Sequence, residues 1–262
     1  MAEIGELTYA KRNPETLDQI EAQNNVKILY ACESGSRAWG FPSPDSDYDV
    51  RYLYIRPVES YLKLFSERDV IEGPIDEVKD FVGWDLQKAL KLLMKGNAPL
   101  IEWVRSPIVY KDNPWLRENL VKLFNEHSDF NALYRGYFGL AKNNFKAYLT
   151  GESVKPKKYL HVLRSVLACE WIKQKKTIPP VLFKEVYEGI LVPGTPFYAE
   201  FQELLKIKAE EKERTTGDHF VAVDKFIDEF FNESKGPLLS SKEPVNVDEY
   251  DNFFLECLRR EN

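Results

Sequence analysis

The first part of the chain consists of short apolar runs separated by polar turns, a pattern typical of β-strands. Residues 26–32 (VKILYAC) form an apolar run that predicts a buried strand. Residues 47–55 (DYDVRYLYI) predict a second strand, and a short helix is expected over residues 60–68. Residues 69–82 supply two further strands, broken at a Gly-Pro pair. We expect the sheet to end there.

From residue 84 onward the apolar positions follow the period of a helix. Leu86, Ala89, Leu90 and Leu93 have the i, i+3, i+4, i+7 spacing of an amphipathic helix. Pro and Gly residues then separate further predicted helices, which cover residues 113–126, 129–149, 157–175, 180–190, 196–214, 218–232 and 248–260. The predicted fold class is α/β (α+β): an N-terminal α/β unit followed by an α-helical region.

Composition narrows the classes of function. The chain has 262 residues, with 36 Lys and Arg against 42 Asp and Glu, and this net charge of −6 argues against a protein that coats duplex nucleic acid. Cys32, Cys169 and Cys257 have no metal-binding spacing and are expected to be reduced. The chain shows no signal-peptide pattern and no apolar run long enough for a membrane span. We expect a cytoplasmic protein with no membrane partner.

The most informative stretch is residues 35–51, GSRAWGFPSPDSDYDVR. A Gly-Ser pair that ends a strand and opens a helix presents backbone N–H groups to an anion such as a phosphate. Strand alternation places Asp47, Asp49 and Arg51 on one face. Two carboxylates near a phosphate site are what a pair of Mg²⁺ ions needs to bridge a nucleoside triphosphate and an attacking hydroxyl. An isolated D-x-D pair, however, is more often a solvated turn.

The complete pattern, G-S-R-A-x-G followed by D-S-D-x-D, resembles the signature of the DNA polymerase β-like nucleotidyltransferase superfamily. The resemblance implies that Gly35 and Ser36 form the phosphate-binding turn and that Asp47 and Asp49 bind metal. Arg37 lies next to Ser36, where its guanidinium is expected to pair with a phosphate or with a substrate group. It also implies a third carboxylate on a neighbouring strand, which acts as a base or metal ligand. Three residues are candidates for this role: Asp76, Asp80 and Asp85, of which we prefer Asp80. Asp85 is better explained as a helix N-terminal acid.

The resemblance narrows to nucleotidyltransferases of the YcgL/RlaP type, and it runs from about Lys27 to Phe183. It includes the helix DLQKALKLLMKGNAPLIEW and the later segment KKYLHVLR. One departure is Ala98, where that family tends to have Pro. The resemblance implies a small mixed-sheet nucleotidyltransferase domain over residues 1–112 and an α-helical domain over residues 113–262 that contributes to the nucleotide and acceptor cleft.

Lys88, Asn97 and Glu102 look like positions that this family keeps. Lys88 is expected to aim its ammonium at the triphosphate, although a solvated helix position explains it equally well. Asn97 is equally well explained as a cap, and Glu102 as a partner of a nearby cation.

A second set of candidate nucleotide-binding residues lies in the segment KKYLHVLR. Lys157, His161 and Arg164 share one helix face, with Lys158 beside them. That face is expected to contact phosphates or base. The alternative is an ordinary solvated face with an incidental histidine.

These features together predict a transferase that uses Mg²⁺ or Mn²⁺. It would move a nucleoside monophosphate from ATP, or from another triphosphate, to an acceptor hydroxyl and release pyrophosphate. The acceptor would be an RNA end or a protein side chain; a sugar or an antibiotic would need the same chemistry. The alternative from another class is a non-catalytic nucleotide-sensing or antitoxin-like interaction module.

Overall fold

The structure is a computed structural model that describes residues 16–43, 46–73, 79–127, 130–151, 153–210, 219–233 and 246–261. Its contacts group into two compact units. Unit 1 takes the described residues within Met1–Gly35, Asp47–Ser128 and Pro244–Asn262, and unit 2 takes those within Ser36–Ser46 and Asp129–Glu243. This grouping differs from a single break after residue 112, because two helices that follow this residue, Pro114–His127 and Val247–Glu261, pack with the helices of unit 1.

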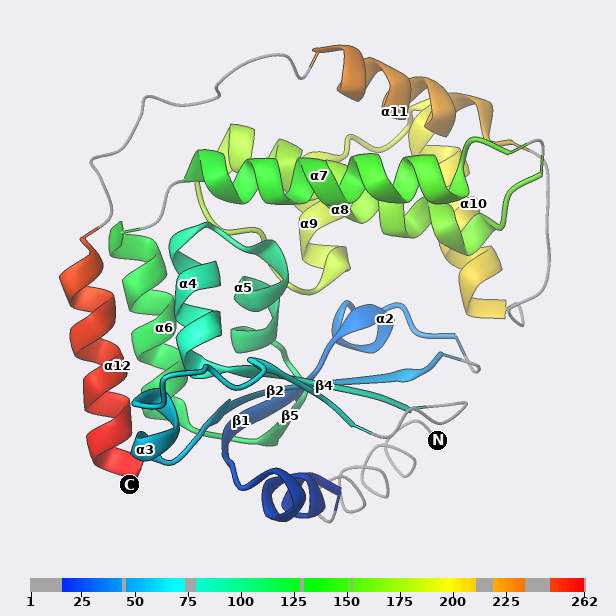
Figure 1. Cartoon of the computed structure of the whole chain (residues 1–262). Helices are drawn as coiled ribbons and strands as arrows, with labels where there is room; N and C mark the ends of the chain where they lie inside the picture. The colour runs from blue at the N-terminus through cyan, green and yellow to red at the C-terminus, as the bar shows by residue number, and fades with distance from the viewer. Residues whose placement is uncertain are drawn as a thin grey trace. The chain divides into compact units, whose positions relative to one another are not determined.

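Unit 1 is built on a five-stranded mixed sheet of order β3-β4-β2-β1-β5 (Figure 1). The strands are β1 (Lys27–Glu33), β2 (Tyr48–Ile55), β3 (Val70–Glu72), β4 (Lys79–Asp85) and β5 (Val109–Lys111). β2 and β4 run parallel, and the other neighbouring pairs are antiparallel. The mixed α/β class is confirmed. The expectation that the sheet ends near residue 82 is wrong, because β5 adds an edge strand beside β1.

Strand alternation in β2 separates a core face from a face that carries charge. Val50, Tyr52 and Tyr54 point to one side, where they pack with Leu17 and Ile20 of the helical residues 16–24. The other side carries Asp49 and Arg51, which are followed along the strand by buried Leu53 and Ile55. In Figure 1 the 16–24 helix lies on the opposite side of the sheet from the helices that follow β4.

Four helices of unit 1 pack together beside the sheet: α4 (Leu86–Met94), α5 (Ala98–Val104), α6 (Pro114–His127) and α12 (Val247–Glu261). The short α3 (Val58–Tyr61) follows β2. The segment expected as one helix, DLQKALKLLMKGNAPLIEW, is two. Gly96 has a positive φ of 66°, which breaks the helix, and Asn97 Oδ1 then accepts a hydrogen bond from Leu100 N at 3.0 Å as the N-cap of α5. The interpretation of Asn97 as a cap is confirmed.

Unit 2 is helical and is organised around α8 (Pro156–Lys175). Residues 162–169 of α8 are buried on every side, which requires neighbours all round the helix. These neighbours are α7 (Phe130–Tyr148), α9 (Phe183–Ile190), α10 (Pro196–Glu210) and α11 (Val221–Glu233). In the part of the chain that the structure describes, no helix is both long and apolar enough to cross a bilayer. The three cysteines are free and buried.

Candidate active site

Two of the candidate carboxylates lie side by side across the parallel pair of strands. Asp49 of β2 is in register with Asp80 of β4. Arg51 Nη2 lies between them, 3.0 Å from Asp49 Oδ1 and 2.8 Å from Asp80 Oδ2. The side chains of Asp49 and Asp80 remain 30% and 39% exposed, so a cation in solvent can reach both. Asp80 therefore lies where a third carboxylate was expected, and its role as a ligand stays a prediction.

The electrostatic environment of Asp49 disfavours its charged form. Burial raises the pKa of this carboxyl above its usual value, and the negative charges of Asp80 and Asp47 raise it further, against the opposing effect of Arg51. Such crowding of carboxylates is relieved by a bound divalent cation. The residue types therefore fit Mg²⁺ or Mn²⁺, both of which prefer oxygen ligands.

A glycine is required beside Asp49. Gly35 has a positive φ of 63°, and a Cβ at this position would overlap Asp49 Oδ2. Two independent conditions, backbone conformation and space, therefore exclude larger residues. Ser34 N also donates to Asp49 O at 2.8 Å, which ties the turn before Gly35 to β2. The Gly-Ser turn and the carboxylate at position 49 are thus packed against each other through Gly35.

Glu33 is a buried acid of this region that sequence reasoning missed. It is the last residue of β1, its exposed fraction is zero, and its Oε1 accepts a hydrogen bond from Asp49 N at 2.8 Å. Its Oε2 accepts from the Tyr110 hydroxyl on β5. Glu33 thus fixes the backbone that carries Asp49. A charged residue at the end of an apolar run, just before Gly-Ser, is the signal that could have identified it.

The other two candidates for the third carboxylate are Asp76 and Asp85. Asp76 lies outside the described residues. Asp85 is in register with Tyr54, five residues further along β4 than Asp80, and therefore about 16 Å away along the strand. Its Oδ1 accepts from Gln87 N at 2.8 Å as the N-cap of α4. The interpretation of Asp85 as a helix N-terminal acid is confirmed.

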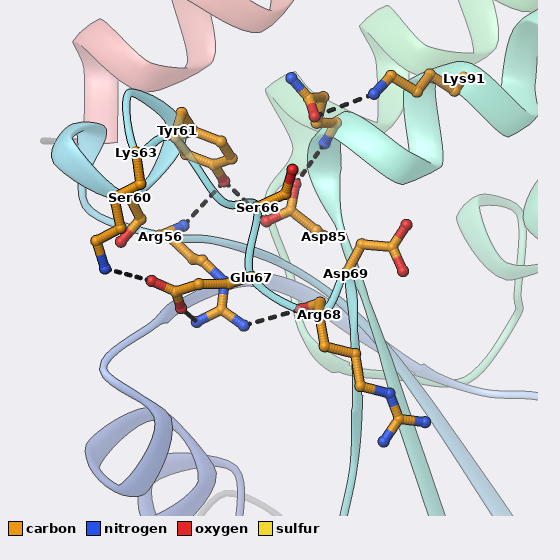
Figure 2. Close-up of a pocket in the computed structure, with 11 residues that line it drawn as sticks. Arg56, Ser60, Tyr61, Lys63, Ser66, Glu67, Arg68, Asp69, Asp85 and Lys91 are labelled. Atoms are coloured by element: carbon orange, nitrogen blue, oxygen red, sulfur yellow. Dashed lines mark hydrogen bonds and ion pairs between the residues drawn. The ribbon is translucent and has the colours of Figure 1, made fainter.

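The surroundings of Asp85 form a polar pocket of about 310 Å³ in unit 1 (Figure 2). Three of its charged groups pair with one another, because Arg56 and Lys63 both contact Glu67. Lys88, on the adjoining turn of α4, pairs with Asp69 at 3.0 Å. These contacts favour a surface ion pair for Lys88 and give no support to an ammonium aimed at a triphosphate.

In the rest of the signature, the described residues 36–43 and 46 belong to unit 2, and hydrogen bonds among them hold this segment, here called the loop. Ser36 begins the loop and its Oγ donates to Ser46 Oγ at 3.1 Å. Arg37 Nη2 donates to Ser46 O at 2.9 Å, so in this structure Arg37 holds the loop. Trp39 O accepts from Phe183 N at 2.9 Å, which fastens the loop beside α9.

The expected basic helix face on α8 packs against this loop. The Arg164 guanidinium is buried and lies 4.3 Å from the Trp39 ring centroid. The His161 ring meets Trp39 edge-on, with centroids 5.6 Å apart. Lys158 lies over the Tyr148 ring at 4.2 Å. The face is therefore not an ordinary solvated one, and nucleotide binding by its residues stays a prediction.

His161 is neutral at physiological pH. Burial lowers its pKa to about 3, and the positive charges of Lys158, Lys208, Lys157 and Arg164 add to this effect. His161 can therefore donate or accept a hydrogen bond, or stack, but it cannot act as a cation toward phosphate.

Lys208 is a further cation of this group that sequence reasoning missed. It belongs to α10, is only 7% exposed, and its Nζ lies 2.7 Å from Ser43 Oγ. A signal existed: Lys208 lies seven residues after Phe201 and four after Leu204, on the apolar face of α10. A lysine on an apolar helix face is placed there for a polar partner.

The candidate metal ligands can also be judged as a set. Among the described residues, no three His, Cys, Asp or Glu side chains are arranged as a ready metal cluster. Arg51 takes one oxygen from each carboxylate of the Asp49–Asp80 pair. The donor chemistry fits Mg²⁺, and Arg51 competes with a cation for one oxygen of each carboxylate.

Comparisons with known proteins show the family of this chain. The family model described as "RlaP: RNA repair pathway DNA polymerase beta family" matches residues 10–256. The uncharacterized protein YcgL of Bacillus subtilis is 45% identical over 214 residues, which is 82% of each chain. The uncharacterized protein MJ0002 of Methanocaldococcus jannaschii is 31% identical over 141 residues, 52% of this chain and 56% of the relative.

A solved structure of a nucleotidyltransferase-like protein from Exiguobacterium sibiricum aligns with 93% of this chain and 91% of its own, at 11% identity and a TM-score of 0.31. The family model and YcgL both cover most of the chain, and the range of the family model includes the Gly35–Ser36 turn and the aspartates. The chain therefore belongs to the RlaP family, the RNA repair pathway branch of the DNA polymerase β family, and is a nucleotidyltransferase at that level of description.

Proposed function

We propose that the protein transfers a nucleoside monophosphate from a triphosphate, with ATP as the first candidate, to a hydroxyl at an RNA end. The observation that carries the proposal is the Asp49–Asp80 pair, two reachable carboxylates in register across parallel strands, with Gly35 packed against one of them. In the chain, the loop lies between Gly35, which packs against Asp49, and Asp47, which precedes Asp49 by two residues. We place the reaction in the cytoplasm, where triphosphates and RNA ends are available.

The reaction forms one bond and breaks one. The acceptor oxygen attacks the α-phosphorus, the bond from the α-phosphorus to its bridging oxygen breaks, and pyrophosphate leaves. The proton of the hydroxyl passes to Asp80 and from there to water. Asp47, Asp49 and Asp80 would hold Mg²⁺ or Mn²⁺, which supplies charge neutralisation and a lower pKa of the attacking hydroxyl when bound.

The loop supplies the groups that would hold the triphosphate. Ser36 Oγ and the backbone N–H groups at the start of α2 (Gly35–Ala38) are suited to the β- and γ-phosphates. Arg164, Lys157 and Lys158 contribute positive charge within unit 2. Neutral His161 and the Trp39 ring offer surfaces against which a base can stack.

An RNA acceptor is favoured by the family, whose description names RNA repair. The net charge of −6 argues against extensive contact with a phosphate backbone. A single RNA end requires few such contacts, so the acidic chain and an RNA acceptor are compatible.

The test is a transfer assay with purified protein, Mg²⁺ or Mn²⁺, each α-³²P-labelled triphosphate, and RNA oligonucleotides with defined 3′ and 5′ ends. We expect label on RNA, sensitive to RNase and resistant to protease. Asp49→Asn should reduce the rate at least about a hundredfold, since even indirect partners of metal ligands typically contribute 10–100-fold. Asp69→Asn is the matched control, because Asp69 lies at the Asp85 end of the sheet.

The outcome also identifies the acceptor. Label that only protease removes would replace the RNA acceptor by a protein side chain, and label on a small molecule would point to a sugar or an antibiotic. Aspartate-independent label would contradict the proposed site.

A second candidate function follows from Arg51. Because Arg51 occupies both carboxylates, a non-catalytic nucleotide-sensing module is the alternative. It predicts saturable binding of ATP without Mg²⁺ and no transfer to any acceptor. Arg51→Ala separates the two, because it frees the carboxylates: metal affinity should rise if they serve a metal and should not change if Arg51 is their permanent partner.

A further inference from the structure

Lys208 is the buried cation nearest the serines of the loop. Its Nζ donates to Ser43 Oγ at 2.7 Å and, more weakly, to Ser46 Oγ at 3.4 Å. Both serines are themselves buried, with 6% and 9% exposure. A cation this deeply buried is costly unless its partners are fixed. The lysine and the two serines therefore constrain one another.

Ser46 is the point where the hydrogen bonds of the loop converge. Its Oγ is approached by three donors: Ser43 N at 2.9 Å, Ser36 Oγ at 3.1 Å and Lys208 Nζ at 3.4 Å. Ser43 Oγ also lies 3.1 Å away, and either of these two hydroxyls can be the donor. A hydroxyl oxygen has two lone pairs, so the three donors exceed its capacity. One of them can leave at little cost. The Ser36 hydroxyl rotates freely about its Cβ–Oγ bond, so it can turn from Ser46 to a phosphate while Ser43 and Lys208 keep Ser46 in place.

The contacts of Lys208 with Ser43 and Ser46 matter because the loop adjoins candidate site residues at both of its ends. The loop follows Gly35, which packs against Asp49, and it ends at Ser46, which precedes Asp47. Ser46 O also accepts from Arg37 Nη2. A side chain that immobilises Ser43 and Ser46 therefore fixes both the start of the loop, through Ser36 and Arg37, and its end, one bond before a candidate metal ligand.

We propose that Lys208 is a positioning residue that clamps Ser43 and Ser46 and thereby presents the Ser36 hydroxyl to the triphosphate. The proposal deepens the proposed function and depends on it for the identity of the ligand. Lys208 acts through the serines and does not itself touch the nucleotide.

The test compares Lys208→Met with Lys206→Met, an exposed lysine on the same helix. The first readout is the Kd of Mg²⁺–ATP and, where transfer occurs, KM against kcat. Lys208→Met should raise the Kd and KM at least about fivefold, a loss within the range of one hydrogen bond to a charged group. Lys206→Met should match the original protein.

The second readout does not need a nucleotide. Amide hydrogen exchange should accelerate selectively at Phe41 and Ser43, whose N–H groups are bonded inside the loop, while the middle of α8 keeps its protection. The His161 resonance should also titrate at higher pH, because Lys208 is one of the charges that lower its pKa. Uniformly faster exchange would mean general destabilisation, and Ser46→Ala, which keeps the lysine, then takes the place of Lys208→Met.

A double-mutant cycle tests whether Lys208 acts through Ser46. If Lys208 acts through Ser46, then Lys208→Met and Ser46→Ala together should weaken ATP binding no more than the worse single variant. Additive losses, or unchanged ATP binding with unchanged loop exchange in Lys208→Met, would overturn the proposal. Should the original protein bind no triphosphate, the proposed function fails, and the exchange data alone still decide whether Lys208 clamps the loop.

Discussion

Asp49 and His161 have pKa values displaced against their charged forms, and in both cases burial is the largest cause. Each is expected to lower the stability of the ligand-free protein: Asp49 at neutral pH, where it is ionised, and His161 in acid. Residues in functional sites commonly have this property, because a site selected for ligand binding is not optimised for folding.

Asp49→Asn should stabilise the cation-free protein at pH 7. The pKa of Asp49 is raised in the folded state, so its ionised form is disfavoured on folding, and the associated stability is lost as pH rises through that pKa. Asparagine removes the charge and keeps an acceptor for Arg51. In the absence of divalent cations, thermal unfolding should show a higher Tm for the variant than for the original protein. Added Mg²⁺ should raise the Tm of the original protein and leave that of the variant unchanged. A lower Tm for the cation-free variant would contradict this.

His161 should make unit 2 sensitive to acid. Its pKa falls from 6.5 to about 3 on folding, so the unfolded chain binds more protons between these pH values, and stability is lost as pH falls through this window. The slope is at most about 1.4 kcal/mol per pH unit. Urea unfolding at several pH values should show a shallower dependence in His161→Gln. Parallel curves for the two proteins would contradict the prediction.

At the scale of elements, the hydrophobic pattern predicted most helices and strands of the described chain within a few residues. It missed β5, a strand of three half-buried residues with no alternation long enough to detect, which is defined by pairing with β1. It also joined α4 and α5, because the apolar period continues through the Gly96-Asn97 break. Strand pairing and backbone conformation decide such details, and neither is periodic in sequence.

The same reason separates the predicted site residues from the missed ones. The Gly-Ser turn and the aspartates lie within one short stretch of chain, and their residue types are informative together. Lys208 meets Ser43 across 165 positions, and Glu33 meets Tyr110 across 77. Only the packing of unit 2 and the pairing of β1 with β5 bring these partners together, so the sequence alone could not pair them.

The N-cap of α5 can be tested directly. Asn97→Ala removes the acceptor of Leu100 N and should cost about 1 kcal/mol of unfolding free energy, whereas Asn97→Asp keeps an acceptor and should cost much less. Chemical denaturation of the two variants measures the difference. Equal losses would mean that Asn97 stabilises α5 by some means other than its cap.

At the scale of the whole molecule, the end of the chain completes unit 1. α12 packs against α4, and its Phe253 stacks on Trp115 with ring centroids 5.4 Å apart. Arg260 lies 4.1 Å from the centroid of the same Trp115 ring. Glu261 pairs with Lys27 at the start of β1. Unit 1 therefore depends on residues from both ends of the sequence.

Phe253→Ala should lower the unfolding free energy by about 3–5 kcal/mol, the usual cost of removing a buried phenyl ring. Leu255→Ala, on the same helix but 45% exposed, should cost far less. Denaturant unfolding followed by tryptophan fluorescence reports on both, because Trp115 contacts Phe253. A small loss for Phe253→Ala would show that α12 contributes little to unit 1.

The interleaving of the two units has a consequence for the history of the protein. The chain passes between them at residues 35–36, 46–47, 128–129 and 243–244, so neither unit is one continuous segment. A single cut anywhere between residues 35 and 244 divides unit 1 between two fragments, and a cut between residues 36 and 243 divides unit 2 as well. The loop that carries Ser36 lies between Gly35 and Asp47 in the chain, so recombination that replaces residues 129–243 leaves the loop with the carboxylates, and the two are inherited together.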